Sequence, residues 1–120
     1  MAQKPFRYDF DLWVGADQSI QFRLTRDDQG TAFPINGMRL IFVARSGFQP
    51  TSGVILKRDL TIVDGDDGLC QIDFTTAETQ TFATHSERVY EIMRLSESKT
   101  LPLGFGFIHL EGGASAGLTL

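Results

Sequence analysis

Apolar and polar residues alternate along much of the chain, which is the pattern of β-strands with one buried face. Residues 6–12 and residues 20–25 alternate in this way, so each run predicts a strand. Between them, Gly15-Ala16-Asp17 predicts a turn, and residues 27–30 have the composition of a loop. The apolar positions of the two runs are Phe6, Tyr8, Phe10, Leu12, Ile20, Phe22 and Leu24.

A third strand-like segment is apolar on both faces. Leu40, Phe42 and Ala44 share one face, while Ile41 and Val43 lie on the other. Such a strand needs cover on both sides. The Gly-, Ser- and Pro-rich segment that follows it predicts a loop.

Further strand-like runs continue to the end of the pattern. Residues 54–63 predict a strand pair or one bent strand, because Lys57-Arg58-Asp59 interrupts the apolar positions. The remaining runs are residues 70–74, 89–95 and 103–110. About seven short strands separated by turns, without an amphipathic crossover helix, predict an all-β fold, an immunoglobulin-like antiparallel β-sandwich. We expect a single domain over residues 1–112 and a flexible tail over residues 113–120.

One short helix interrupts the strands. Thr75 has the position of an N-cap residue, and Glu78 follows at the spacing of a capping box. Only Ala77, Thr81 and Phe82 can anchor it. The helix should therefore have one or two turns.

Composition narrows the classes of function. The chain has 120 residues, 15 acidic and 11 basic side chains and a formal charge of −4, with no basic block that would attract nucleic acid. Its single cysteine cannot form an internal disulfide. The N-terminal sequence lacks the apolar run of a signal peptide, and no segment approaches the length of a membrane span. We therefore expect synthesis in a cytoplasm and no membrane or nucleic-acid partner.

The residues that most often carry catalysis are sparse. Cys70 shares a predicted strand face with Ile72 and Phe74, which favours a buried structural thiol. His85 falls in a predicted loop and His109 on the last strand, at spacings that match no zinc pattern. A small enzyme that uses Cys70, His85 and a carboxylate is the weakest hypothesis, and we expect no catalytic residues.

Two glycine-containing motifs have ordinary structural explanations. Asp64, Asp66 and Asp67 form a turn too short to supply a calcium site alone, and no closing glutamate follows. Gly104 and Gly106 lie inside a strand with no helix after them, so they favour close packing or a bulge over phosphate binding. We expect no metal and no cofactor.

The surplus of apolar residues on the strands is more informative. On the last strand, either Ile108 and Leu110 face the core and Phe105 and Phe107 face outward, or the reverse holds. Outward apolar strand faces mark contacts with other proteins, although a helix or the N-terminal segment of the same chain can also cover them. The candidate contact residues are Ile41, Val43, Phe105 and Phe107.

A second hypothesis is a carbohydrate- or ligand-binding sandwich. Trp13 or Tyr8 would then provide the stacking platform for the ligand. The alternative for Trp13 is partial burial at the end of a strand.

From Asp11 to Gly112 the chain resembles a β-sandwich module of tailed-phage structural proteins, the N-terminal domain of baseplate upper proteins and related tail-fibre attachment domains. The similar pieces are DLWVGADQSIQFRLTRDDQG, PINGMRLIFVAR, DGDDGLCQIDFTTAETQTF, RVYEIMRL and LGFGFIHLEGG. In that family a glycine before the third strand, a Thr-x-x-Glu-Thr corner and a tyrosine-bearing strand recur in this order. The corresponding residues here are Gly37, Thr75 to Thr79 and Tyr90.

The resemblance implies a non-enzymatic phage or prophage structural protein located in the virion. Baseplate upper proteins continue into further parts, whereas this chain ends soon after its last strand. It therefore implies a stand-alone attachment, adaptor or decoration module. Its partners would be other virion or tail proteins or further copies of itself, with repeated copies gaining avidity from modest interfaces.

Overall fold

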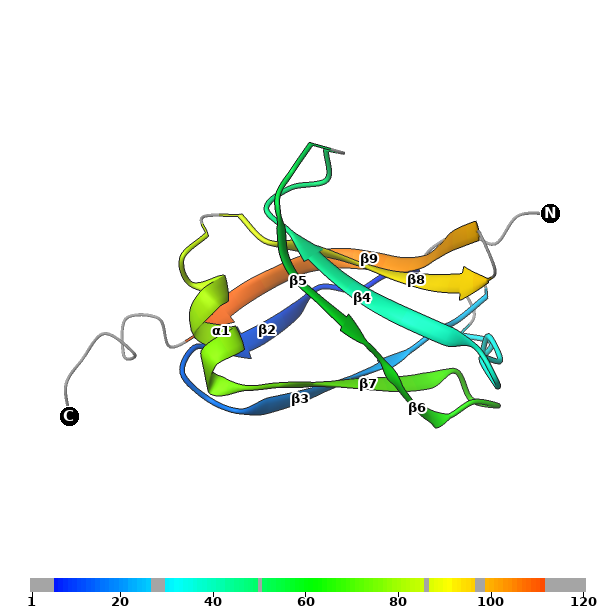
Figure 1. Cartoon of the computed structure of the whole chain (residues 1–120). Coiled ribbons are helices and arrows are strands. Elements are labelled where there is room, and N and C mark those ends of the chain that lie inside the picture. Colours follow the sequence, from blue (N-terminus) through cyan, green and yellow to red (C-terminus); the bar gives the residue numbers. More distant parts are fainter. Residues whose placement is uncertain (1–5, 27–29, 50, 86, 97–98, 112–120) are drawn as a thin grey trace.

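The computed structural model describes residues 6–26, 30–49, 51–85, 87–96 and 99–111. Two β-sheets pack face to face, and one short helix closes an end of the sandwich between them (Figure 1). The prediction of an all-β sandwich with one short helix is confirmed. The predicted tail over residues 113–120 lies outside the described residues. No helix in the described part of the chain is long and apolar enough to cross a membrane.

The larger sheet has the strand order β1-β9-β8-β4-β5, with β2 also paired to β9. Its members are β1 (Phe6–Arg7), β2 (Phe10–Trp13), β4 (Arg39–Arg45), β5 (Val54–Asp59), β8 (Val89–Ser96) and β9 (Lys99–Glu111). The smaller sheet has the order β3-β7-β6. Its members are β3 (Gln18–Arg23), β6 (Thr61–Asp64) and β7 (Leu69–Phe74). These two orders correspond to the G-F-C-C′ and B-E-D strands of an immunoglobulin fold.

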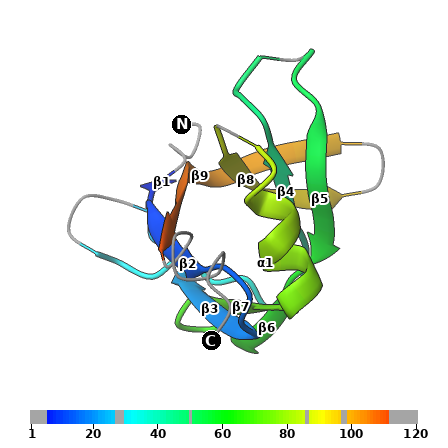
Figure 2. The same ribbon diagram turned by 90° about the vertical axis from the view of Figure 1, so that its left-hand side faces the viewer.

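The sandwich is not antiparallel throughout. β1 and β2 both run parallel to β9, with Arg7 opposite Phe105 and Phe10 opposite Ile108. A parallel pair needs a long connection, and here the whole intervening domain provides it. The first and last strands thus lie side by side at one edge (Figure 2).

The N-terminal run predicted as one strand is divided into β1 and β2 at Tyr8 and Asp9. Both halves keep the same register against β9. At the break, Asp9 Oδ1 accepts a hydrogen bond from the Phe107 N–H at 2.9 Å. The carboxylate thus takes the place of a backbone carbonyl. This hydrogen bond, followed by the one from Arg7, lowers the pKa of Asp9.

Residues 54–63 form one bent segment that changes sheets. β5 belongs to the larger sheet and β6 to the smaller, with only Leu60 between them. Leu60 is buried, and its N–H donates to the Leu40 carbonyl at 2.9 Å. The segment is therefore two strands, one in each sheet, joined by a bend at Leu60.

Aromatic rings fill the centre of the sandwich. Tyr90 lies 5.3 Å from Phe42 and 5.1 Å from Phe10, centroid to centroid, and Phe22 and Phe74 complete the group. The five rings come from both sheets and are buried. Edge-to-face and stacked pairs at these separations add to the free energy gained from burial.

Gly106 allows the N-terminal segment to reach the sheet. A Cβ at this position would overlap the Tyr8 carbonyl oxygen and lie 2.9 Å from Cε1 of Tyr90. The Tyr90 hydroxyl donates a hydrogen bond to that same carbonyl oxygen. The prediction that Gly106 permits close packing is confirmed, and a register shift between Ile92 and Met93 adds a bulge in the same strand pair.

The helix α1 (Thr76–Phe82) begins at the predicted cap, and both hydrogen bonds of the Thr75–Glu78 capping box are present. The predicted anchors were only partly correct. Phe82 is buried, but Ala77 and Thr81 are exposed. The second buried residue is Thr79, whose hydroxyl accepts a hydrogen bond from the Gly15 N–H at 3.0 Å and so ties the helix to the turn before β3.

Candidate interaction face

The outer face of the larger sheet points away from the sandwich core and carries apolar residues that lie outside the core cluster. Cross-strand pairing places Val43, Glu91 and Phe105 side by side across β4, β8 and β9. A neighbouring row contains Val89 and Phe107. Phe105 and Phe107 therefore face outward while Ile108 is buried in the core, which decides between the two sequence alternatives.

Phe48 stands over this face from the loop between β4 and β5. Its ring meets Phe107 edge-on at 5.5 Å and Phe105 at 6.0 Å between centroids. We call these three residues the aromatic cluster. Phe48 is 44% exposed, and both strand phenylalanines are half-buried. The cluster is therefore an apolar surface that solvent still reaches.

Hydrogen bonds to two backbone carbonyls hold the loop that carries Phe48. The Ser46 N–H donates to the Gly53 carbonyl at 3.0 Å, and Arg45 Nη1 donates to the Ser52 carbonyl at 3.1 Å. These contacts fix both ends of the loop. Phe48 is thus presented from an anchored loop, which lowers the entropy cost of using it in a contact.

A charged pair borders the aromatic cluster at the edge formed by β1. The Arg7 guanidinium lies 5.2 Å from the centroid of the Phe107 ring and forms an ion pair with Asp9 at 3.3 Å. Asp9 in turn accepts the Phe107 N–H. Arg7 is therefore engaged by a ring and a carboxylate of its own chain.

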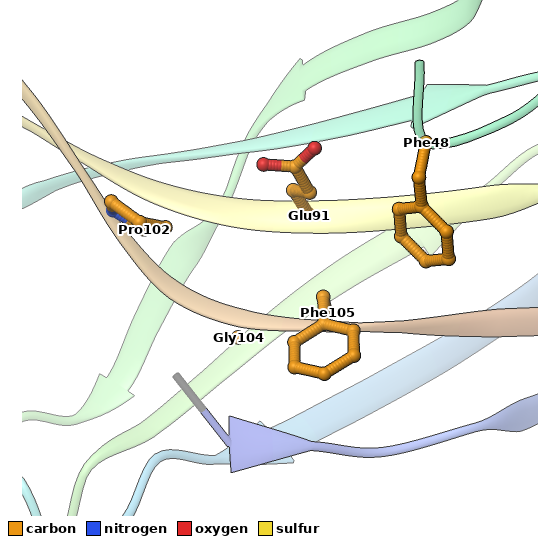
Figure 3. A pocket seen from close by; sticks show the side chains of 5 residues that line it. All are labelled: Phe48, Glu91, Pro102, Gly104 and Phe105. Atoms are coloured by element: carbon orange, nitrogen blue, oxygen red, sulfur yellow. The ribbon is translucent and has the colours of Figure 1, made fainter. Parts of the chain in front are cut away.

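A hollow of about 210 Å³ adjoins the cluster. It is lined by Phe48, Glu91, Pro102, Gly104 and Phe105 (Figure 3). Phe48 reaches it from the loop, and Glu91, on β8, is the one ionisable residue among the described residues that line it. The outer face thus combines rings, a small depression and one carboxylate.

Two of the four predicted contact residues are not available at the surface. Ile41 and Val43 do point away from the core cluster, but they are only 3% and 4% exposed. They lie in the middle of the sheet. In register, Lys57 and Glu91 flank Val43, while Asp59 and Met93 flank Ile41. The inference that they form an exposed surplus is wrong, because alternation gives the face of a residue but not what its neighbours cover.

The two residues predicted as a ligand platform are exposed but are not brought together. Tyr8 is 46% exposed and lines a separate hollow of about 340 Å³ with side chains of β3 and with Thr25. Trp13 is 57% exposed at the far end of β2. Five residues of extended chain separate them by roughly 16 Å. They cannot share one small ligand.

The nucleophile candidate is part of the core. Cys70 is fully buried, its Sγ contacts the Phe22 carbonyl oxygen at 3.7 Å, and burial raises the pKa of its thiol to about 12. His85 lies after α1, where its N–H donates to the Phe82 carbonyl at 3.2 Å, and His109 is exposed on β9. The prediction that Cys70 is a core residue is confirmed.

The aspartates of the turn before β7 interact with neighbouring residues instead of converging on one point. Asp67 forms an ion pair with Arg23 at 3.1 Å, and Asp66 accepts a hydrogen bond from Asn36 at 2.6 Å. Within the described residues, no group of three or more His, Cys, Asp or Glu side chains is arranged to hold a metal ion.

Sequence reasoning missed Phe48, Glu91 and Arg7. Phe48 could have been noticed as a large aromatic residue inside a Gly- and Ser-rich loop. Glu91 alternates with buried Tyr90 and Ile92, so its face was predictable. Its position beside rings from another strand and a loop was not.

No family model matches the chain, and no curated protein matches it. Among solved structures it is similar to a DUF4784 family protein from Bacteroides caccae ATCC 43185, with 14% sequence identity and a TM-score of 0.43. The match covers 84% of this chain and 22% of the other, so this chain spans a small part of that protein's length. A likeness at this level carries no argument about function.

Proposed function

We propose that the chain is a non-enzymatic assembly module, a phage or prophage structural protein of the kind that its sequence resembles. It acts by docking the outer face of its larger sheet against further copies of itself or other virion proteins. The observation that carries the proposal is the aromatic cluster, in which Phe48, Phe105 and Phe107 remain partly exposed beside a hollow. Aromatic residues next to a depression are typical of the energetic centre of protein interfaces.

The titratable residues support the same proposal, because several of them are buried or engaged in contacts within the chain. Cys70 is committed to the core, and Asp9, Asp67 and Glu78 are committed to hydrogen bonds and ion pairs within the chain. A nucleophile needs a neighbouring base and access to substrate. The exposed apolar surface is therefore a better basis for function than any group of polar residues.

Light scattering after size exclusion, from micromolar to millimolar protein, tests the self-association that the proposal predicts. The wild type should form a discrete oligomer, and Phe48→Asp should remain monomeric and folded, because Phe48 lies on a loop outside the core cluster. Val63→Asp is the matched control, since Val63 is 49% exposed on the smaller sheet. Equal association of all three proteins would contradict this use of the outer face.

The hollow beside Tyr8 favours a second candidate, a carbohydrate- or ligand-binding module. Besides Tyr8 and Phe22, this hollow is lined by Gln21, Arg23 and Thr25, which offers one ring face with polar groups. Glycan binding that Tyr8→Ala removes and Trp13→Ala preserves would support this candidate. Binding that depends on Trp13 alone would point instead to the end of β2.

A further inference from the structure

The hollow beside the aromatic cluster has a defined chemistry. Phe48, Phe105, Pro102 and the backbone of Gly104 make it largely apolar, and Glu91 places a single carboxylate in it. Figure 3 shows Glu91 between Pro102 and Phe48, with Phe105 on the neighbouring strand. Two rings and an anion around one depression provide the groups that attract an organic cation.

Glu91 has no cationic partner among the residues that the structure describes. The four ion pairs found there use other carboxylates, those of Asp9, Asp59, Asp67 and Glu78. In the sheet, Glu91 lies between Val43 and Phe105. As a residue Glu91 is half-buried between these two apolar side chains, where water screens a charged contact less than it does on an open surface.

The cations nearest to Glu91 in register do not occupy this position. Arg45 lies diagonally from Glu91 on the adjacent strand, and its Nη1 donates to the Ser52 carbonyl at 3.1 Å. Lys57 pairs with Val43 and Arg7 with Phe105, so each is two strands from Glu91, about 10 Å. Arg7 is already engaged by Asp9 and by the Phe107 ring. Each of these cations is thus engaged elsewhere or lies at a distance from the Glu91 side of the hollow.

We propose that this hollow receives an arginine side chain from the protein on which the module docks. The planar guanidinium can lie against Phe48 or Phe105 while it donates hydrogen bonds to Glu91, and its alkyl stem can contact Pro102. This inference rests on the proposed function and specifies the chemistry of the partner.

The size of the hollow and the charge of the chain agree with this occupant. Pockets for drug-sized ligands run from roughly 300 to 1,000 Å³, whereas this hollow measures about 210 Å³ and suits one long side chain. The net charge of −4 also favours approach by a basic segment.

A titration of the ¹⁵N-labelled chain with two small probes tests the proposal. N-acetyl-arginine methylamide should shift the amide resonances of Glu91, Gly104 and Phe105 saturably, with a Kd on the order of 1 mM. N-acetyl-citrulline methylamide has nearly the same shape without the charge, and should bind about tenfold or more weakly. Equal shifts from both probes, or shifts scattered over all acidic surfaces, would overturn the proposal.

Two variants assign the binding to Glu91. Glu91→Gln keeps the shape of the side chain and should lose about tenfold in affinity for the arginine probe. Glu87→Gln removes the same charge from an exposed position just before β8 and should bind as the wild type does. Unchanged binding by Glu91→Gln would reject the site. If that variant folds poorly, the comparison of the two probes on the wild type still tests the proposal.

The outcome is separable from that of the proposed function. If Phe48→Asp abolishes association but the arginine probe does not bind, the interaction face stands and the arginine proposal fails. If the probe binds at Glu91, the arginine site stands whether or not the chain associates with itself.

Discussion

Gly106 and Cys70 show how single residues fix the packing of this sandwich. Gly106 lets the Tyr8 carbonyl approach the sheet closely, where the hydroxyl of buried Tyr90 donates to it. Cys70 fills space in the core as a small apolar side chain. Alternation predicted the buried face of Cys70 correctly, because that face is set within its own strand. It did not predict the burial of Ile41 and Val43, which depends on residues of neighbouring strands.

Gly106→Ala should destabilise the protein by about 1–3 kcal/mol, the usual cost of overpacking a tight contact. The added Cβ would lie 2.7 Å from the Tyr8 carbonyl carbon and 2.9 Å from the Tyr90 ring. Gly53→Ala is the control, because its Cβ would meet only Ser46 Oγ, at 4.0 Å. Urea unfolding of both variants measures the difference. Equal stability would contradict the close approach of Tyr8.

Cys70 should make stability depend on alkaline pH. Burial raises the pKa of its thiol to about 12, so between about pH 9 and 12 the unfolded thiol ionises while the folded one stays protonated. This contribution is fully present at lower pH. It is lost as pH rises, by up to about 1.4 kcal/mol per pH unit.

Unfolding midpoints of the wild type and Cys70→Ala, measured from pH 8 to pH 10.5, test this dependence. The alanine variant lacks the thiol, so any stability advantage of the wild type should shrink as pH rises. A difference that stays constant over the range would show that the thiol ionises equally in both states.

At the scale of elements, α1 and the paired N- and C-terminal strands differ in how far local sequence determines them. The helix was predictable because its capping box lies within four residues. The parallel pairing of β1 and β2 with β9 was not, because it depends on bringing together residues about one hundred positions apart. Thr79 was missed for a similar reason, since its partner is the turn before β3.

The ion pair between α1 and β5 should contribute measurably to stability. Arg58 Nη1 lies 2.6 Å from Glu78 Oε2, and both side chains are partly buried. Burial raises the pKa of Glu78, but the hydrogen bonds from Thr75 and Arg58 outweigh it and the pKa is lowered. The ion pair therefore stabilises the fold above the usual carboxyl pKa, and this stabilisation is lost as pH falls through the lower folded value.

Glu78→Gln retains a side chain able to complete the capping box but removes the charge. It should cost about 1 kcal/mol at pH 7 and much less at a pH low enough to protonate the wild-type carboxyl in the folded protein. Glu87→Gln, on the exposed segment before β8, should cost little at either pH. A loss for Glu78→Gln that is the same at both pH values would exclude the ion pair as its cause.

At the scale of the whole molecule, the two sheets leave one outer face with exposed rings and a carboxylate-bearing hollow. The strand periodicity of the sequence was sufficient to predict a β-sandwich. It also limited the last strand to two possible orientations, with either Ile108 or the phenylalanines facing the core. The outer face could not be predicted from the sequence, because it combines residues of β8, β9 and the loop that carries Phe48, and only the folded structure brings these segments together. The proposed assembly of the chain depends on this face.

Hydrogen–deuterium exchange, compared between dilute and concentrated protein, shows which face of the sandwich is buried when the chain associates. We expect the amides of the Phe48 loop and of β9 around Phe105 to gain protection at high concentration, while the exchange of β3 and β6 stays unchanged. Phe48→Asp should show no such gain. A gain in protection around Tyr8 and β3, with the Phe48 loop unaffected, would contradict the account.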